Sequence, residues 1–278
     1  MSARTWFTTG INSGFGRLMT EEILQRGDRV AGTVRNLEAV ADLQQRFRDR
    51  LWVDHLDVTD ASGIDRVVDR AFADLGRIDV VVNNAGYGLF GAAEGFRDSQ
   101  IVEQVATNLL GPIRIARAAL PHLRRQGGGR ILVISTFGGQ ATLPGGSMYH
   151  ASKWGLEGFF DALGKEVAPF GIAVTIVEPG SASTGFRSAA KSHLAPDLDA
   201  YKGTPVDMIH AVLNSAAMAP KGDALKMVKA IVATVDQTPA PTRLVLGSDS
   251  YGLIQKALAD RLALVESQKD LALSMELG

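Results

Sequence analysis

The chain has 278 residues, of which 46% are hydrophobic and 21% charged, and its formal net charge is −1. This composition is typical of a globular protein, and so small a net charge gives no electrostatic basis for binding nucleic acid or an acidic membrane. Because the chain contains no cysteine, disulfides, thiolate metal sites and cysteine nucleophiles are excluded.

Short apolar runs of strand length alternate along the chain with amphipathic stretches of helix length. The runs that favour strands are 5–9, 29–34, 51–58, 80–83, 130–134, 173–177 and 243–246. The stretches that favour helices are 19–24, 37–47, 64–75, 101–123, 148–167, 224–235 and the tail from 254 onward. Strands that are apolar on both faces indicate a parallel sheet with helices on both sides. We therefore expect an α/β fold with one doubly wound, Rossmann-type parallel sheet, forming one domain over residues 1–278.

The segment from 183 to about 220 breaks this alternation. It contains Pro196, Pro205 and Pro220, scattered glycines and no clear strand. So long a connection in a compact domain is usually a functional lid or holds short helices of its own. We expect it to be a lid over the substrate.

Residues 1–7 lead into a strand-like segment without the apolar core of a signal peptide. No apolar run approaches the roughly 18 residues that span a bilayer. We therefore expect a cytoplasmic protein with no membrane partner.

A glycine-rich turn, Thr9-Gly10-Ile11-Asn12-Ser13-Gly14-Phe15-Gly16, follows the first strand and opens the first helix. Glycines let the backbone approach a pyrophosphate, and the helix N-terminus supplies free N–H groups and partial positive charge. An ordinary strand-to-helix turn is the alternative, but the place of this turn after the first strand of an alternating chain favours dinucleotide binding.

Three further motifs follow in order: Asn83-Asn84-Ala85-Gly86, Tyr149-His150-Ala151-Ser152-Lys153, and Pro179-Gly180-Ser181-Ala182-Ser183-Thr184. Together with the pattern T-G-x-x-x-G-x-G, they make the chain resemble the short-chain dehydrogenase/reductase family from its first strand through Thr184. The resemblance implies hydride transfer between a nicotinamide and a carbonyl or alcohol carbon. The cofactor-binding residues that it implies are Gly10, Asn12, Ser13, Gly14, Phe15, Gly16, Arg35, Asp57, Val58, Asn84, Ala85, Gly86, Tyr149, Lys153, Pro179, Gly180 and Thr184.

The end of the second strand indicates which cofactor is used. An acidic residue at this place holds the ribose 2′-hydroxyl of NAD, whereas an arginine accommodates the 2′-phosphate of NADP. Here the strand ends without an acidic residue, and Arg35 follows it. We therefore expect NADP(H); the alternative is that Arg35 is a solvated surface arginine. Asp57 and Val58 resemble the family's adenine-contacting pair.

Tyr149 and Lys153 are four residues apart in a helical stretch, so they share a face. Carbonyl reduction needs a proton donor, and a nearby ammonium should lower the tyrosine pKa from about 10 towards neutrality. The resemblance implies that Lys153 also binds the nicotinamide ribose. An exposed Tyr–Lys pair without function is the alternative.

The family places a catalytic serine thirteen residues before the tyrosine, and here that position is Thr136. Thr136 keeps the hydroxyl that would bond the substrate oxygen, and its methyl group stiffens the side chain. The neighbouring Ser135 is the alternative. Asn108 matches the family's asparagine that holds a water for proton relay; a buried asparagine that satisfies helix backbone is the alternative.

The predicted function is the reversible reduction of a ketone, a small-molecule substrate. An NADP-binding regulator or scaffold without turnover is the rival. The expected substrate walls are Phe90, Leu143, Pro144, Phe186, Leu194 and Met208, which favour a hydrophobic ketone. The five histidines show no ligand spacing, so no metal is expected. The resemblance implies a homodimer or homotetramer. Trp154 and Phe159 are expected in the core, with an interface as the alternative.

Overall fold

The computed structural model describes residues 3–214 and 220–277, and its strands form one seven-stranded sheet. The strands are β1 (Thr5–Thr9), β2 (Arg29–Val34), β3 (Leu51–His55), β4 (Val80–Asn83), β5 (Gly129–Ile134), β6 (Ile172–Pro179) and β7 (Arg243–Leu246). All neighbouring strands are parallel, in the order β3-β2-β1-β4-β5-β6-β7. The expected doubly wound α/β fold is thus confirmed.

Eleven α-helices are described in these residues. They are α1 (Gly14–Gln25), α2 (Ala41–Phe47), α3 (Ala61–Leu75), α4 (Asp98–Val105), α5 (Gly111–Arg125), α6 (Ser147–Val167), α7 (Phe186–Lys191), α8 (Met208–Asn214), α9 (Ala224–Ala233), α10 (Ser248–Ser267) and α11 (Lys269–Leu273). The single helix expected over 101–123 is divided by a π-helical turn, Ala106–Leu110. The strand expected over 51–58 ends at His55, because the Asp57 side chain and carbonyl close a turn with Thr59 and Asp60.

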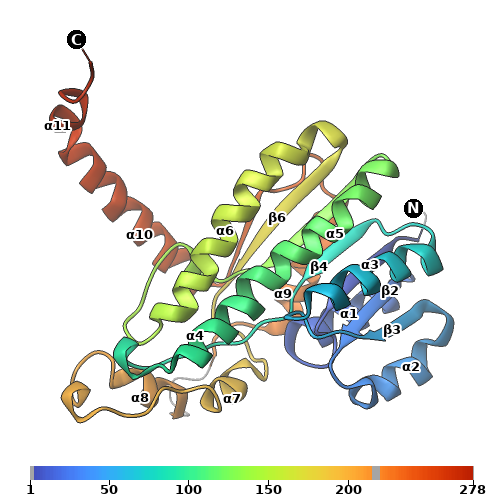
Figure 1. The fold of residues 1–278 in the computed structure, drawn as a ribbon, viewed down its shortest axis with the longest axis horizontal. Coiled ribbons are helices and arrows are strands. Elements are labelled where there is room, and N and C mark those ends of the chain that lie inside the picture. Colours follow the sequence, from blue (N-terminus) through green and yellow to red (C-terminus); the bar gives the residue numbers. More distant parts are fainter. Residues whose placement is uncertain (1–2, 215–219, 278) are drawn as a thin grey trace.

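Helices cover both faces of the sheet because alternate strand residues point to opposite sides. Phe7 and Val81 are buried in one apolar cluster with residues of α3, α5 and α6. Trp6 and Val82 are buried in the other, with residues of α1 and α9. Figure 1 shows α5 and α6 along one face of the sheet. The two clusters hold the carboxyl ends of the strands at fixed positions.

The strand order places the sequence motifs at one edge. The chain moves outward from β1 through β2 to β3, then returns to place β4 on the other side of β1. Ligands of open α/β sheets bind where the order reverses, at the carboxyl ends of the strands. The ends of β1, β4 and β6 carry three of the four motifs, and the fourth, Tyr149–Lys153, lies on α6, the helix that follows β5.

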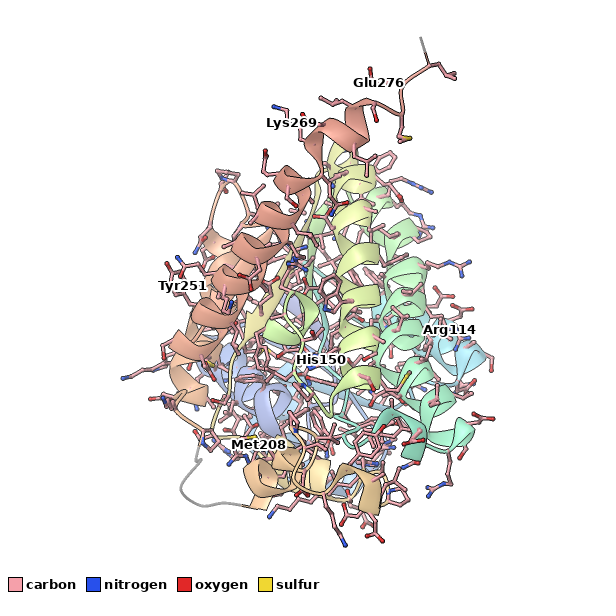
Figure 2. All side chains as sticks on the ribbon, turned by 90° about the vertical axis from the view of Figure 1, so that its left-hand side faces the viewer. Arg114, His150, Met208, Tyr251, Lys269 and Glu276 are labelled. Carbon is pink, nitrogen blue, oxygen red and sulfur yellow. The ribbon has the colours of Figure 1, made fainter. Side chains whose placement is uncertain are left out.

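Helices α10 and α11 form an arm that leaves the body of the molecule (Figure 1). Figure 2 places Lys269 and Glu276 at its outer end, away from His150 and Met208. Where the arm starts to diverge, the Arg261 guanidinium lies 4.8 Å from the centre of the Trp154 ring. Trp154 is 41% exposed, so its expected place in the core is wrong, whereas Phe159 does pack against the core.

Within residues 3–214 and 220–277, no helix combines the length and the apolar character needed to cross a membrane.

Candidate functional site

The glycine-rich turn lies at the carboxyl end of β1 and leads directly into α1. The Gly10 amide donates to the carbonyl of Thr33 at 2.9 Å, which ties the turn to β2. A Cβ on Gly16 would lie 2.1 Å from the carbonyl oxygen of Gly10 and 2.4 Å from the Asn84 side chain. Gly16 therefore permits the close approach of α1 to the end of β1.

The first turn of α1 has the features of an anion site. Ser13 precedes it in an extended conformation and makes no capping hydrogen bond through its side chain. The first turn holds no acidic residue, and Asn12 and Ser13 are exposed beside it. The helix therefore keeps unpaired N–H groups and the positive end of its dipole. These groups fit a pyrophosphate, while Phe15 packs partly buried against the core.

The segment after β4 is bonded to the end of β1. Thr9 Oγ1 accepts hydrogen bonds from the amides of Asn84 and Ala85, both at 3.1 Å. Asn84 Nδ2 donates to the Thr9 carbonyl at 2.8 Å. The Asn-Asn-Ala-Gly motif and the glycine-rich turn therefore lie side by side where the strand order reverses.

Arg35 follows β2 and is exposed. It makes no hydrogen bond or ion pair with any residue that the structure describes, although its charge acts on Asp57. The Arg17 guanidinium is instead engaged by Glu21 and Asp42. Of these two arginines, Arg35 therefore has its donors available to a ligand.

Asp57 and Val58 lie just beyond β3. The Asp57 carboxylate accepts hydrogen bonds from the Thr59 amide at 2.9 Å and hydroxyl at 2.7 Å. Burial acts to raise the pKa of Asp57, but these bonds and the charge of Arg35 hold it below its ordinary value. Val58 is buried against Gly111.

The Pro179–Thr184 segment runs from the end of β6 towards the glycine-rich turn. A Cβ on Gly14 would lie 3.8 Å from the Thr184 side chain. The carboxylate of Asp249, on α10, accepts hydrogen bonds from the Ser181 amide at 2.8 Å and hydroxyl at 2.6 Å. The first turn of α10 thus holds the turn at Gly180 in place.

Tyr149 and Lys153 lie one turn apart on α6, and they are only 9% and 7% exposed. Lys153 Nζ donates to the carbonyl of Ile134 at 2.8 Å, at the end of β5. It lies 6.0 Å from the centre of the Tyr149 ring. A solvent-exposed pair is therefore excluded.

Burial is the main influence on the pKa values of Tyr149 and Lys153. It raises the pKa of Tyr149, with a hydrogen bond to Thr136 acting in the opposite direction. It lowers the pKa of Lys153 to about 8, with the charge of Glu157 acting to raise it. The expectation of a lowered tyrosine pKa is therefore wrong for this structure, because removal from water disfavours both charged forms. Tyr149 is held as a neutral phenol, the form that donates a proton.

Ser135 and Thr136 point in different directions from the end of β5. Thr136 Oγ1 lies 3.2 Å from the Pro179 carbonyl oxygen and is hydrogen-bonded with Tyr149. Ser135 Oγ instead donates to Glu157 at 2.5 Å. Successive residues of extended backbone project to opposite sides, so only the threonine hydroxyl reaches the tyrosine.

Asn108 lies in the π-helical turn between α4 and α5 and is buried. Its side chain accepts from the Tyr87 amide at 3.0 Å, and it donates to the Tyr87 carbonyl at 2.8 Å and to Ser152 Oγ at 3.2 Å. A Cβ on Gly86 would lie 3.0 Å from Asn108 Oδ1 and 3.8 Å from Lys153 Nζ. The amide of Asn108 thus supports the loop after β4, close to the lysine.

Aromatic rings cover Tyr149. The ring centres of Phe90 and Phe186 lie 5.3 and 5.8 Å from that of Tyr149. Leu194 forms a short parallel bridge with Phe90. The segment after β6 therefore crosses the site and contains α7 and α8. Residues 215–219 of the expected lid lie outside the described residues, and Met208 on α8 is 60% exposed.

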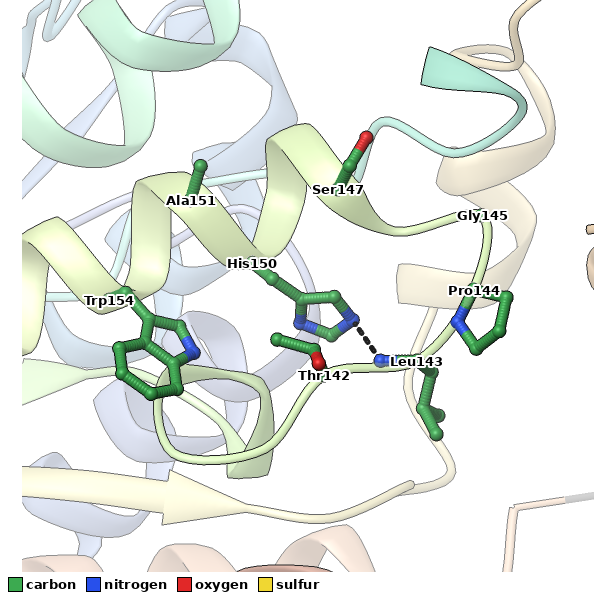
Figure 3. A pocket seen from close by; sticks show the side chains of 8 residues that line it. All are labelled: Thr142, Leu143, Pro144, Gly145, Ser147, His150, Ala151 and Trp154. Carbon is green, nitrogen blue, oxygen red and sulfur yellow. Dashed lines mark hydrogen bonds between the residues drawn. The ribbon is translucent and has the colours of Figure 1, made fainter. Parts of the chain in front are cut away.

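Leu143 and Pro144 are the remaining residues of the expected substrate walls. They line a hollow of about 540 Å³ together with Trp154 and His150 (Figure 3), and its lining includes neither Tyr149 nor Lys153. Its place beside Trp154 puts it on another face of α6. The contribution of these two residues to the wall around Tyr149 stays a prediction.

His150 holds the loop that forms this hollow. Its Nε2 accepts from the Leu143 amide at 3.1 Å, shown in Figure 3, and its Nδ1 lies 3.1 Å from the Gly138 carbonyl oxygen. Burial lowers the pKa of His150, which agrees with a neutral ring that carries its proton on Nδ1. Its role is structural, and in the described part of the chain no three His, Asp or Glu side chains are grouped to hold a metal.

Sequence reasoning missed the buried carboxylates behind the site, Glu157 and Glu178, and their partner Arg243. One signal could have found the first of them. Glu157 continues the four-residue spacing of Tyr149 and Lys153, so all three lie on one stripe of the helix.

Comparison with known proteins agrees with this geometry. The family model described as short chain dehydrogenase matches residues 4–195. Oxidoreductase BOA17 of Botryotinia fuckeliana is 33% identical over 272 residues, which cover 98% of each chain. A crystal structure of a short-chain dehydrogenase from Streptomyces avermitilis is 35% identical, with a TM-score of 0.91 over 99% of this chain and 100% of that one.

More distant structures share the fold and hold either dinucleotide. A Burkholderia phymatum protein in complex with NAD is 18% identical, with a TM-score of 0.78 over 98% of this chain and 95% of that one. A Burkholderia cenocepacia protein in complex with NADP is 23% identical, with a TM-score of 0.74 over 95% and 96%.

Proposed function

The chain belongs to the short-chain dehydrogenase/reductase family, and from this premise we propose that it is an NADP(H)-dependent oxidoreductase of hydrophobic ketones and secondary alcohols. The observation that carries the proposal is the buried group of Thr136, Tyr149 and Lys153 at the carboxyl end of β5. A protein that only binds a dinucleotide has no need of a buried phenol hydrogen-bonded with a second hydroxyl.

The reaction requires a proton for the carbonyl oxygen. NADPH, when bound, supplies the hydride to the carbonyl carbon. Tyr149 donates its phenolic proton to the oxygen on which negative charge develops. The Thr136 hydroxyl, turned away from the Pro179 carbonyl to which it donates here, donates a hydrogen bond to the same oxygen. Lys153, when charged, stabilises the phenolate left on Tyr149. In the direction of alcohol oxidation, Tyr149 takes the proton back.

The residues of this chain fit the dinucleotide. The uncapped start of α1 and the close packing at Gly16 suit the pyrophosphate. Among the residues that the structure describes, none bonds the guanidinium of Arg35 and competes with a 2′-phosphate. Arginine binds phosphate through charge-assisted hydrogen bonds, so we assign the preference to NADP(H).

The cover over Tyr149 favours apolar substrates. Phe90 and Phe186 meet the tyrosine ring, and Leu194 pairs with Phe90 in a short parallel bridge. We propose that the chain acts as one domain in which the segment from 183 to about 220 is the lid. We also propose that it assembles as a homodimer or homotetramer.

The test is the loss of reduced-nicotinamide absorbance with a panel of apolar ketones and aldehydes. Wild-type protein should consume NADPH, and faster than NADH. A regulator or scaffold would bind NADPH with measurable affinity and consume none with any member of the panel. That result would overturn the proposal.

A further inference from the structure

One buried carboxylate, that of Glu157, bonds both ends of the turn 135–140, which carries Thr136. Ser135 Oγ donates to Glu157 Oε1 at 2.5 Å. Gln140 Nε2 donates to Glu157 Oε2, also at 2.5 Å. Glu157 is 2% exposed, so water does not compete for these bonds. Its carboxylate therefore fixes the turn from both ends.

The same carboxylate belongs to the helix that carries the other two groups of the site. Glu157 lies one turn beyond Lys153 and two turns beyond Tyr149 on α6. A Cβ on Gly139 would lie 1.9 Å from Glu157 Oε1. The missing side chain at Gly139 thus lets the turn lie directly on the helix at this residue.

A guanidinium joins the carboxylate to the third segment of the site. Arg243 Nη1, at the start of β7, lies 2.5 Å from Glu157 Oε2 and 2.5 Å from Glu178 Oε1. Glu178 is 1% exposed and directly precedes Pro179, whose carbonyl accepts from Thr136. Asp161 is more distant, at 3.9 Å from Arg243 Nη2.

We propose that Glu157 is a positioning residue: by holding Ser135 and Gln140, it sets the position of the Thr136 hydroxyl relative to the two catalytic groups of α6, Tyr149 and Lys153. We call Glu157, Ser135 and Gln140 the Glu157 clamp. The inference rests on the proposed function. The clamp touches neither substrate nor cofactor. Its effect arises because the two partners of one substrate oxygen, Thr136 and Tyr149, come from different elements. Glu157 joins these elements through the side chains at both ends of the turn, and His150 of α6 also bonds the Gly138 carbonyl between them.

Charge gives the clamp a second effect on the site. The Glu157 carboxylate lies one helical turn from the Lys153 ammonium and favours its protonated form. The groups that face Glu157 from the packed elements are Ser135, Gln140, Lys153, Glu178 and Arg243. Burial and the charge of Glu157 raise the pKa of Glu178. Removal of the Glu157 charge should therefore make Lys153 easier to deprotonate.

The first test is Glu157→Gln, which keeps the size of the side chain and removes its charge. Misplacement of a catalytic group by about 1 Å costs roughly 100-fold in rate, so we expect kcat to fall by about ten- to 100-fold. The Kd for NADPH should not change. The basic limb of the pH profile of kcat should move to lower pH. Glu166→Gln is the matched control, since Glu166 is an exposed carboxylate on the same helix, and it should behave as wild type.

The second test is the double variant Ser135→Ala/Gln140→Ala, which releases the turn but leaves Glu157, Glu178 and Arg243 intact. Its kcat should fall by about tenfold or more, and its basic limb should stay in place because the charge of Glu157 remains. If Glu157→Gln does not fold, the kcat of the double variant alone tests the clamp. Unchanged kcat in a folded variant of either kind would overturn the clamp.

The proposed function and the clamp fail in different ways. If wild-type protein reduces no carbonyl in the panel, the proposed function is wrong, and the clamp is then judged from crystal structures. A turn displaced at Thr136 in the double variant would support it, and an unmoved Thr136 would refute it. If wild-type protein is active and the variants match it, only the clamp is wrong.

Discussion

Ser135 and Thr136 are neighbours in the chain, yet their hydroxyls serve different parts of the molecule. The Ser135 hydroxyl is 2.5 Å from a carboxylate oxygen of Glu157, behind the site. The Thr136 hydroxyl is bonded with Tyr149 and lies 3.2 Å from the Pro179 carbonyl oxygen. Because the two hydroxyls have different partners, substitutions at Ser135 and at Thr136 should affect kcat differently.

Thr136→Val should lower kcat by about 10²–10³, because a lost donor to a developing oxyanion costs about 2.7–4 kcal/mol. Thr136→Ser keeps the hydroxyl and should remain active, with improved acceptance of bulkier ketones. Ser135→Ala alone should be mild, since Gln140 still holds Glu157. Steady-state kinetics of the three variants decide the assignment. A crippled Ser135→Ala beside a healthy Thr136→Val would show that the wrong hydroxyl has been chosen.

Tyr149→Phe should abolish turnover while NADPH still binds. The variant removes the proton donor and keeps the ring that packs against Phe90 and Phe186. Cofactor binding is measured by calorimetry or by quenching of intrinsic fluorescence, and turnover by nicotinamide absorbance. Retention of most of the wild-type kcat would rule out the proposed proton transfer.

Arg35→Ala should reduce the preference for NADPH over NADH. A charge-assisted contact with the 2′-phosphate is worth about 1.5–3 kcal/mol, or about tenfold or more in affinity. Arg17→Ala is the control, because Glu21 and Asp42 already engage that guanidinium, and it should leave the ratio of kcat/KM values almost unchanged. Equal use of both cofactors by wild-type protein would contradict the assignment.

The pH dependence of reduction should follow Lys153. Its pKa is lowered to about 8 by burial, so the ammonium is present below this pH and is lost as the pH rises through it. We therefore expect kcat for ketone reduction to be flat on the acidic side and to fall above about pH 8. Lys153→Arg, which keeps a cation throughout, should lose this limb along with much of its activity. A limb that persists unchanged in the variant must belong to another group.

The segment from 183 to 214 should be protected when cofactor and substrate analogue bind together. Phe186 covers Tyr149 from this segment, and the bridge between Leu194 and Phe90 holds it to the loop after β4. If this segment closes over the substrate as a lid, its closure should slow hydrogen exchange. The C-terminal end of α3, which leads to the start of β4 at the opposite edge of the sheet, is the internal control. Equal protection with and without ligands would exclude a lid that closes on binding.

The sequence by itself determined the architecture and the location of the site. Apolar runs separated by amphipathic stretches could be predicted as a parallel sheet, because strands buried on both faces must be apolar on both. Three of the four motifs directly follow a strand, and the fourth lies on α6, the helix after β5. All strands of a parallel sheet end at one edge. Glycine spacing, the Tyr149–Lys153 interval and the arginine at position 35 are therefore enough to predict a dinucleotide site.

Only the tertiary structure decided how these groups are placed and charged. Trp154 is exposed and Glu157 is buried on the same helix, since the neighbouring elements, and not helical spacing alone, determine which stripe is covered. Burial raises the pKa of Tyr149, and the rings that lie against it, Phe90 and Phe186, come from distant segments. The link between Glu157 and Arg243 joins α6 to the last strand. Such contacts depend on packing between residues far apart in the chain, and local sequence patterns do not predict this packing.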